Sequence, residues 1–248
     1  MRMLTLLFVI TSVTAVAQDK IKTLTLSDTI VDAAVDRPGD FYAITKSGQI
    51  QRFDKDGKLS VLYKAKEVPT IFDPRDGARL FAYYRSEQYY QYLNPSFEVT
   101  ASYKIDPSFA IQPWLLCPSG DHKLWLLDGA DHSLKKINVR ESEVEVEVVV
   151  DSALTGNPEA FKSMREYQNF VFLLNPDKGL YVFNGLGHYL RTVGGPGIRS
   201  FNFLGEELYY LEGGKLHFLN LFTTDTREMI IDPIYTDVLL TDERMILF

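Results

Sequence analysis

The feature that most constrains this chain is a strand pattern that repeats along its length. Short apolar segments recur at intervals of 37 to 46 residues and are separated by turn-forming residues. They begin near Phe41, Leu80, Leu124, Phe170, Leu208 and Met245. No stretch keeps an apolar stripe at helical spacing over three turns. The pattern predicts an all-β chain built from repeated antiparallel meanders.

One unit of this repeat is especially clear. Two apolar runs, Trp114 to Cys117 and Leu124 to Leu127, are separated by a turn that contains Pro, Ser, Gly and Asp. Alternating segments at Leu134 to Ile137 and Val144 to Val150 complete a unit of four strands. Four strands at this spacing are typical of one β-propeller blade. Because a single blade cannot bury both faces of its sheet, blades stack around an axis and close into a ring.

We predict a β-propeller of about six four-stranded blades, the last of which is incomplete. Five full units can be counted, and the sixth contains only Asp237 to Leu240 and Met245 to Phe248. The segment Ile21 to Leu26 carries apolar residues among polar ones. A last blade closed by this N-terminal strand is therefore an alternative, and it would remove exposed sheet edges.

The first residues have the three parts of a secretory signal peptide. Arg2 gives a basic start, Leu4 to Val13 an apolar core, and Ala15-Val16-Ala17 a small-residue cleavage site. We expect a signal peptide at 1–17 and a single propeller domain at 18–248. No other apolar run approaches the length of a membrane helix. The expected location is the periplasm or the outer membrane surface, with an extracellular location as the alternative.

Charge and cysteine content exclude several classes of function. The formal net charge of −7 argues against nucleic acid and anionic membrane surfaces as partners. Cys117 is the only cysteine, so the chain cannot form an internal disulfide. Because Cys117 falls in an apolar strand, we expect a buried, unreactive thiol.

The motifs of common catalytic and metal sites are missing from the sequence. The four histidines lack H-x-H and H-E-x-x-H spacing, and no G-x-S-x-G turn is present. They are His122, His132, His188 and His217. The sequence predicts no catalytic residue, no metal site and no cofactor.

Several blades resemble a known superfamily. Phe41 to Leu59, with the sequence Phe-Tyr-Ala-Ile-Thr-Lys-Ser-Gly-Gln-Ile-Gln-Arg-Phe-Asp-Lys-Asp-Gly-Lys-Leu, resembles a blade of the NHL/YWTD-like six-bladed propellers. Lys123 to Asn138 and Gly179 to Asn184 resemble degenerate versions of it. The Ala-x-Ala-Gln end of the signal segment is similar to exported proteins of Bacteroidota-type bacteria. The resemblance implies architecture, and propellers with that architecture include enzymes, receptors and scaffolds.

A ring of polar residues is the strongest candidate for a binding site. In propellers the first strand of each blade lines the central channel, and one polar residue lies near the start of each such strand. These residues are Asp32, Thr70, Gln112, Lys162, Arg199 and Asp237. We predict that they surround the mouth of the channel. The alternative interpretation is that they only solvate a water-filled channel.

The function expected from this pattern is a non-catalytic interaction module of the bacterial cell envelope. It would bind an envelope protein through the channel mouth and the surrounding loops. One alternative is a hydrolase or lyase that acts through Asp32 and Asp237. Another is a small anionic ligand held by Lys162 and Arg199.

Overall fold

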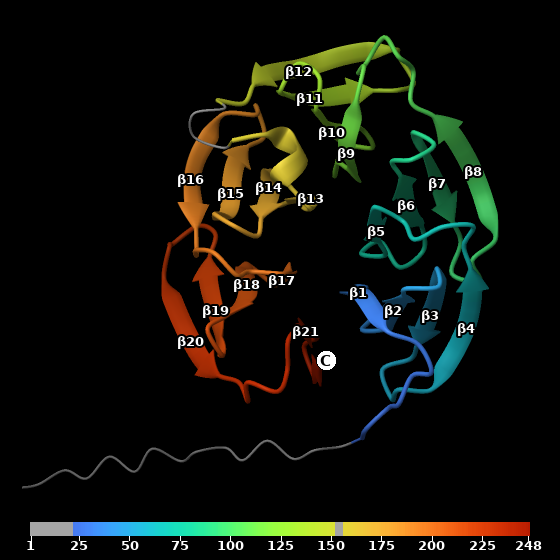
Figure 1. Ribbon diagram of the computed structural model, residues 1–248, viewed down its shortest axis with the longest axis vertical. Coiled ribbons are helices and arrows are strands. Elements are labelled where there is room, and N and C mark those ends of the chain that lie inside the picture. Colours follow the sequence, from blue (N-terminus) through green and yellow to red (C-terminus); the bar gives the residue numbers. More distant parts are fainter. Residues whose placement is uncertain (1–21, 152–155) are drawn as a thin grey trace, which may run out of the picture.

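The computed structural model describes residues 22–151 and 156–248. It contains five antiparallel four-stranded sheets and one two-stranded sheet. The sheets surround a central axis, with the first strand of each sheet nearest the centre (Figure 1). The prediction of an all-β propeller is therefore confirmed.

Each four-stranded sheet is one blade, and its strands follow one another in the chain. Blade 1 contains β1 (Ile30–Val35), β2 (Phe41–Thr45), β3 (Gln49–Phe53) and β4 (Leu59–Lys64). Blade 2 contains β5 (Ile71–Asp73), β6 (Leu80–Tyr84), β7 (Tyr89–Leu93) and β8 (Val99–Lys104). Blade 3 contains β9 (Pro113–Pro118), β10 (Leu124–Asp128), β11 (Ser133–Asn138) and β12 (Glu143–Val149). Blade 4 contains β13 (Ser163–Tyr167), β14 (Phe170–Asn175), β15 (Gly179–Asn184) and β16 (Tyr189–Val193). Blade 5 contains β17 (Phe201–Leu204), β18 (Glu207–Glu212), β19 (Lys215–Asn220) and β20 (Thr226–Ile230). A short 3-10 helix, Pro158–Ala160, precedes blade 4.

Turn chemistry explains where the strands end. Between β3 and β4, Asp54 accepts hydrogen bonds from the backbone amides of Asp56 and Lys58 at 3.0 and 2.8 Å. Gly57 completes the turn with a φ of 70°, a conformation that costs glycine little. Asparagine serves the same purpose between β15 and β16, where Asn184 accepts from the amide of His188. Short polar side chains therefore set the length of these two hairpins.

The core lies between neighbouring sheets rather than inside any one of them. All residues of β2, β6 and β10 are buried, whereas the outer strands β4, β8 and β12 are largely exposed. Trp125 of β10 is fully buried between blades 3 and 4, where it packs with residues from both. Burial of apolar side chains on both faces of these second strands stabilises the stacking of the blades.

The sixth position in the ring holds a hairpin and not a full blade. It consists of β21 (Val238–Leu240) and β22 (Met245–Leu247). The structure thus has five complete blades where about six, with the last incomplete, are expected from the sequence. Residues 22–26 form no strand beside this hairpin. Lys22 instead donates to the carbonyl oxygens of Asp56 and Gly57 in blade 1.

The described part of the N-terminal segment packs near the C-terminal hairpin. Leu26 packs with Leu239, Ile246 and Phe248 in a cluster that also includes side chains of blade 1. Within residues 22–26 the contact with the hairpin is thus made by side-chain packing, and these residues form no strand there. Ile21 and the predicted signal peptide at 1–17 lie outside the described residues.

Two further expectations concern Cys117 and membrane segments. Cys117 is buried, and burial raises the pKa of its thiol, as expected for an unreactive cysteine. Within residues 22–151 and 156–248, no helix is long and apolar enough to cross a membrane.

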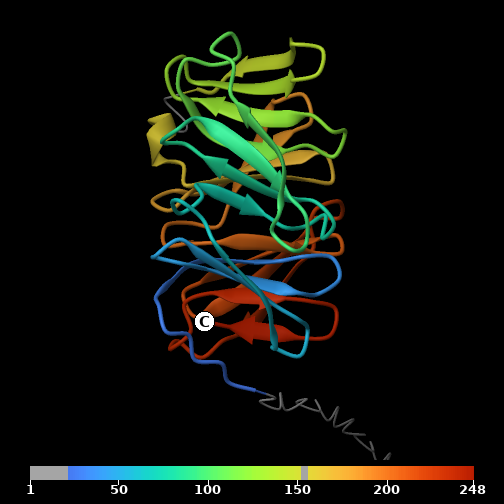
Figure 2. The same ribbon diagram turned by 90° about the vertical axis from the view of Figure 1, so that its right-hand side faces the viewer.

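The meander places loops alternately on the two faces of the ring, which Figure 2 shows edge-on. We call the face on which the first strand of each blade begins the entry face. It carries the links between blades and the turn between the second and third strands of each blade. The opposite face is the exit face. All six predicted site residues lie at the start of a first strand or just before it, which is the entry-face end.

Candidate functional site

The six predicted residues divide into two groups on the entry face. Thr70, Gln112 and Lys162 belong to blades 2, 3 and 4. Asp32 and Asp237 belong to blade 1 and the hairpin, and Arg199 immediately precedes blade 5. The first group surrounds an aromatic ring and its cations, and the second is centred on two carboxylates.

Trp114 of β9 is the centre of the first group. Its indole Nε1 donates to the carbonyl oxygen of Phe161 at 2.9 Å. The guanidinium carbon of Arg85 lies 3.6 Å from the centroid of the indole ring, and Nζ of Lys162 lies 6.0 Å from it. A cation over an aromatic face is stabilised by the ring quadrupole. We call Arg85, Ile111, Trp114 and Lys162 the tryptophan rim.

Thr70 and Gln112 position this rim. The hydroxyl oxygen of Thr70 accepts from the backbone amide of Arg85 at 3.1 Å. Gln112 donates to the Glu159 carboxylate at 3.2 Å. The buried carboxylate of Asp128 accepts from the amides of both Ile111 and Gln112. As a result the Ile111 side chain is held on the surface, where it is 77% exposed.

The second group is built from carboxylates on two inner strands. Asp32 accepts from the amide of Ala33 at 2.9 Å, and Asp237 accepts from the amide of Val238 at 2.8 Å. Asp237 also accepts from the hydroxyl of Ser200. The two aspartates thus occupy equivalent positions in neighbouring blades, although they come from opposite ends of the chain.

Burial raises the pKa of both carboxyl groups. Burial raises the pKa of Asp32 to about 6; the Arg165 guanidinium opposes the shift and the Asp237 carboxylate adds to it. Burial likewise raises the pKa of Asp237, against the hydrogen bond from Ser200. A carboxylate with a pKa near neutrality can exchange a proton or attract a cation.

Arg165 of β13 is the central cation that the sequence analysis missed. Its guanidinium donates to the side-chain oxygen of Asn202 at 3.1 Å, and the arginine is buried. Asp32, Asp237 and Asp73 all interact electrostatically with it. The signal was alternation in β13, where Met164 faces the core and Arg165, next to it, must face the axis.

An ion pair between the buried Asp73 and the partly buried Arg75 also lies between blades. Nε of Arg75 lies 2.9 Å from each carboxylate oxygen of Asp73, and the guanidinium also donates to the carbonyl oxygen of Glu166. Burial alone would raise the pKa of the Asp73 carboxyl, but the Arg75 guanidinium lowers it overall. This pair bridges blades 2 and 4 and keeps the axis polar.

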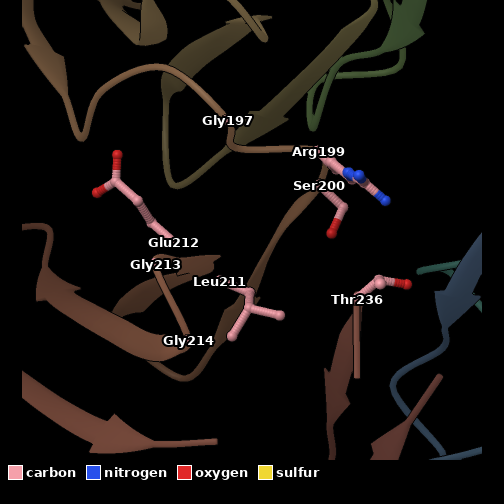
Figure 3. A pocket seen from close by; sticks show the side chains of 8 residues that line it. All are labelled: Gly197, Arg199, Ser200, Leu211, Glu212, Gly213, Gly214 and Thr236. Atoms are coloured by element: carbon pink, nitrogen blue, oxygen red, sulfur yellow. The ribbon is translucent and has the colours of Figure 1, made fainter. Parts of the chain in front are cut away.

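Two cavities open beside the second group. The smaller, of about 120 Å³, is lined by the link into β17 and the turn after β18 (Figure 3). Arg199 and Ser200 lie on that link, and Thr236 lies across the opening. The larger, of about 450 Å³, lies between residues 24–32 and residues 236–248, and Arg199 lines it as well. Arg199 therefore borders both cavities.

The structure separates one predicted pair of site residues and brings another together. Within residues 22–151 and 156–248, no group of three His, Cys, Asp or Glu residues is arranged to hold a metal ion. Lys162 belongs to the tryptophan rim, whereas Arg199 borders the cavities beside the carboxylates. Asp32 and Asp237 form an interacting pair.

Comparison with known proteins places the chain among β-propellers. No family model matches the chain, and no curated protein matches it. Among solved structures, PorZ, a surface component of the type-IX secretion system of Porphyromonas gingivalis, has a TM-score of 0.57 at 13% identity, covering 90% of this chain and 30% of PorZ. The extracellular domain of the putative one component system BT4673 from B. thetaiotaomicron has a TM-score of 0.54 at 13% identity, covering 86% of this chain and 30% of that one.

An enzyme has a similar fold. An inactive virginiamycin B lyase from Staphylococcus aureus has a TM-score of 0.52 at 11% identity, covering 81% of this chain and 69% of the lyase. At such low identity the similarity establishes the fold and nothing further about activity. The same architecture is thus used by a lyase and by a surface component of a secretion system.

Proposed function

We propose that this protein is a non-catalytic interaction module that binds a protein partner on its entry face, through the tryptophan rim. The observation that carries the proposal is the packing of Arg85 over Trp114, with the exposed side chain of Ile111 three residues earlier on the link into the same strand. Tryptophan and arginine are the residues that contribute most often to binding hot spots. An aliphatic side chain held in water gains free energy when a partner covers it.

Charge favours a partner with acidic groups near its contact surface. The chain as a whole is acidic, with a formal net charge of −7. Arg85 and Lys162 are nevertheless both on the rim. A local cationic patch on an acidic protein restricts the orientations in which a partner can approach.

The proposal places the protein in the bacterial envelope as an NHL-like propeller. The signal-peptide pattern at 1–17 supports export, to the periplasm, the outer membrane surface or the exterior. Two proteins of similar fold, the surface component PorZ and the extracellular domain of BT4673, are consistent with that setting. The single domain at 18–248 is part of the same proposal.

Affinity isolation with matched variants tests this function. The tagged protein would be isolated from gently solubilised cell envelopes, and co-purifying proteins would be quantified by mass spectrometry. Ile111→Asp replaces an exposed apolar side chain of the rim with a charge, and we expect it to reduce recovery of the partner by about tenfold or more. Leu186→Asp is the control, because Leu186 is 61% exposed on an exit-face turn.

The two variants separate loss of folding from loss of binding. Both side chains are exposed, so neither substitution removes core packing. Equal recovery with wild type and Ile111→Asp would contradict the proposed surface. Recovery of no stoichiometric partner with the wild-type protein would contradict the interaction module itself.

A further inference from the structure

Arg85 of the tryptophan rim is stacked on an indole ring, and its charged group has no hydrogen-bond partner in the described protein. Its guanidinium carbon lies 3.6 Å from the centroid of the Trp114 ring. Among residues 22–151 and 156–248, the backbone amide of Arg85 donates to Thr70, but the guanidinium forms no hydrogen bond or ion pair. No buried side-chain nitrogen in these ranges lacks a partner, so the unbonded N–H groups of this guanidinium reach solvent. They are therefore accessible to a ligand.

The other arginines that lie over aromatic rings in the described part of the chain also have a side-chain hydrogen-bond partner. Arg227 is the nearest match, because its guanidinium carbon lies 3.5 Å from the centroid of Phe218. Arg227 donates to both carboxylate oxygens of Glu207, at 2.8 and 2.5 Å. The remaining pairs are Arg52 with Asp40, Arg79 with Tyr92, and Arg165 with Asn202. Stacking and a bidentate carboxylate thus occur together in blade 5, whereas Arg85 has only the stacking.

The two carboxylates beside the rim are bonded to neutral side chains. Glu67 accepts from the hydroxyl of Ser86, the residue after Arg85, at distances of 2.7 and 2.6 Å to its two oxygens. Glu159 accepts from the side-chain amide of Gln112 at 3.2 Å. Neither carboxylate forms an ion pair with a described residue. The acidic side chains nearest to the rim therefore do not occupy the N–H groups of Arg85.

Lys162 provides a second cation at the same ring. Its Nζ lies 6.0 Å from the Trp114 centroid and donates to the main-chain carbonyl oxygen of Glu159 at 3.0 Å. That bond uses one of three N–H donors. Because both cations lie near one ring, their spacing cannot exceed the sum of 3.6 and 6.0 Å. This limit admits two side chains at positions i and i+2 of an extended chain, which share one face and lie about 7 Å apart.

We propose that the tryptophan rim binds an acidic segment of the partner protein, with Asp or Glu at positions i and i+2. One carboxylate accepts two hydrogen bonds from Arg85, in the arrangement that Arg227 already has in blade 5. The other carboxylate pairs with Lys162. An aliphatic residue beside the acidic pair covers Ile111, which is 77% exposed. The inference rests on the proposed function, because it specifies the chemistry of the partner that the same rim binds.

Directed hydrogen bonds, and not net charge, select this segment. At long range the carboxylates of Glu67 and Glu159 offset the two rim cations, and the chain carries a formal net charge of −7. Long-range attraction of acidic proteins is therefore weak. A bidentate contact from a stacked group requires the planar fork of arginine, which lysine lacks. Arg85→Lys should therefore lose the contact although it keeps the charge.

An NMR titration of the isotope-labelled protein with a capped peptide tests the proposal. The probe is acetyl-Leu-Asp-Ser-Asp-Leu-amide, whose carboxylates are all on side chains, and its control has Asn in place of both Asp residues. The protein has two tryptophans, Trp114 and the fully buried Trp125, so two indole N–H resonances report on binding. We expect the Asp probe to shift the Trp114 resonance and to leave the Trp125 resonance in place. The Asn probe should bind about tenfold more weakly, or worse.

Two arginine variants provide the matched comparison. Arg85→Lys keeps the positive charge and loses the planar fork, and should weaken binding of the probe by about fivefold or more. Arg227→Lys makes the same change to the stacked arginine of blade 5, and should bind the probe like wild type. Lys162→Met should weaken binding several-fold, because it removes the second cation. The dispersion of the remaining amide resonances would establish that each variant is folded.

Each other outcome overturns the proposal. Equal binding of the Asp and Asn probes would show that carboxylates are not recognised. Equal binding to wild type and Arg85→Lys would show that there is no bidentate contact. Binding of an Asn probe only when its C-terminal carboxylate is free would make a chain terminus the ligand. No shift of the Trp114 resonance with the Asp probe would show that the rim takes no acidic segment.

The proposed function fails or stands on a different measurement. Reduced partner recovery with Ile111→Asp, together with no binding of the Asp probe, would leave the rim as the binding surface and remove only its acidic ligand. Unchanged partner recovery with Ile111→Asp, together with binding of the Asp probe, would keep the acidic ligand and contradict the rim as the surface for the recovered partner.

Discussion

The two halves of the entry face use the same positions of the fold for different purposes. In blades 2 to 4 the residues at the strand starts hold Trp114, Arg85 and Ile111 at the surface. In blades 5 and 1 and the hairpin, the corresponding residues line a cavity, and the two aspartates among them interact electrostatically with Arg165. A position near the channel mouth therefore does not determine a role. The neighbours of each residue determine whether its side chain supports an exposed surface or interacts with buried charges.

Arg165 of blade 4 and Lys162, which precedes it, should contribute very differently to stability. Arg165→Met removes the buried guanidinium that compensates Asp32 and Asp237, and should lower the free energy of unfolding by about 2–3 kcal/mol. Lys162 is exposed, so Lys162→Met should change the free energy of unfolding by less than about 0.5 kcal/mol. Urea denaturation of both variants measures these differences.

Partner recovery should show the reverse order for the same two variants. Lys162→Met is expected to reduce recovery of the envelope partner, because it removes a rim cation. Arg165→Met, under conditions where it is folded, should leave recovery unchanged. If Arg165→Met were as stable as wild type, the axial cluster would not have the structural role assigned to it.

The carboxylate pair predicts a pH dependence of stability. Asp32 binds its proton more tightly in the folded state, so the stability that it confers is lost as pH rises from its ordinary value of 3.8 through about 6. Asp32→Asn should therefore raise the free energy of unfolding by about 1–2 kcal/mol at about pH 7.5 and by little at about pH 4. Thermal unfolding across this range measures the effect.

Asp28 is the control with the opposite sign. Hydrogen bonds from Ser47 lower the pKa of Asp28 to about 2. The stability from Asp28 is present above its ordinary value of 3.8 and is lost as pH falls through about 2. Asp28→Asn should lower the melting temperature at neutral pH. A pH-independent effect of Asp32→Asn would contradict the burial of that carboxylate.

The smallest expected effect concerns the support of the rim. Thr70→Val removes the oxygen that accepts from the amide of Arg85, and should cost about 0.5–1.5 kcal/mol. It should also weaken partner binding, because Arg85 is no longer fixed over Trp114. Thr226→Val, at an exposed position of β20, is the matched control. Equal stability and binding for the two variants would show that Thr70 does not position the rim.

The architecture was predictable from the sequence because the patterns that specify strands and turns span only a few neighbouring residues. Strand periodicity and turn residues such as Asp54 and Gly57 act within one hairpin, and the blades follow directly from them. The incomplete last blade was also predictable, since only two strands follow Asp237. The N-terminal strand was wrongly predicted for residues 22–26, which form no strand; Leu26 instead packs against the cluster that contains Leu239.

The positions of the six residues at or near the starts of first strands were predictable, whereas their role in binding stays a prediction. The interaction of Asp32 with Asp237 was not predictable, because it depends on closure of the ring. Arg165 and Trp114 lie inside strands, where alternation marks them as facing the axis or the rim only once the blade is built. Long-range packing, which no local pattern encodes, decides these roles.

Hydrogen exchange of the isolated complex tests the central claim most directly. The amides of the protein would be compared with and without the partner recovered from the envelope. Partner binding through the tryptophan rim predicts protection of the entry-face links at 106–112 and 156–162. Protection confined to exit-face turns, such as 185–188, would contradict the assignment of the entry face as the binding surface.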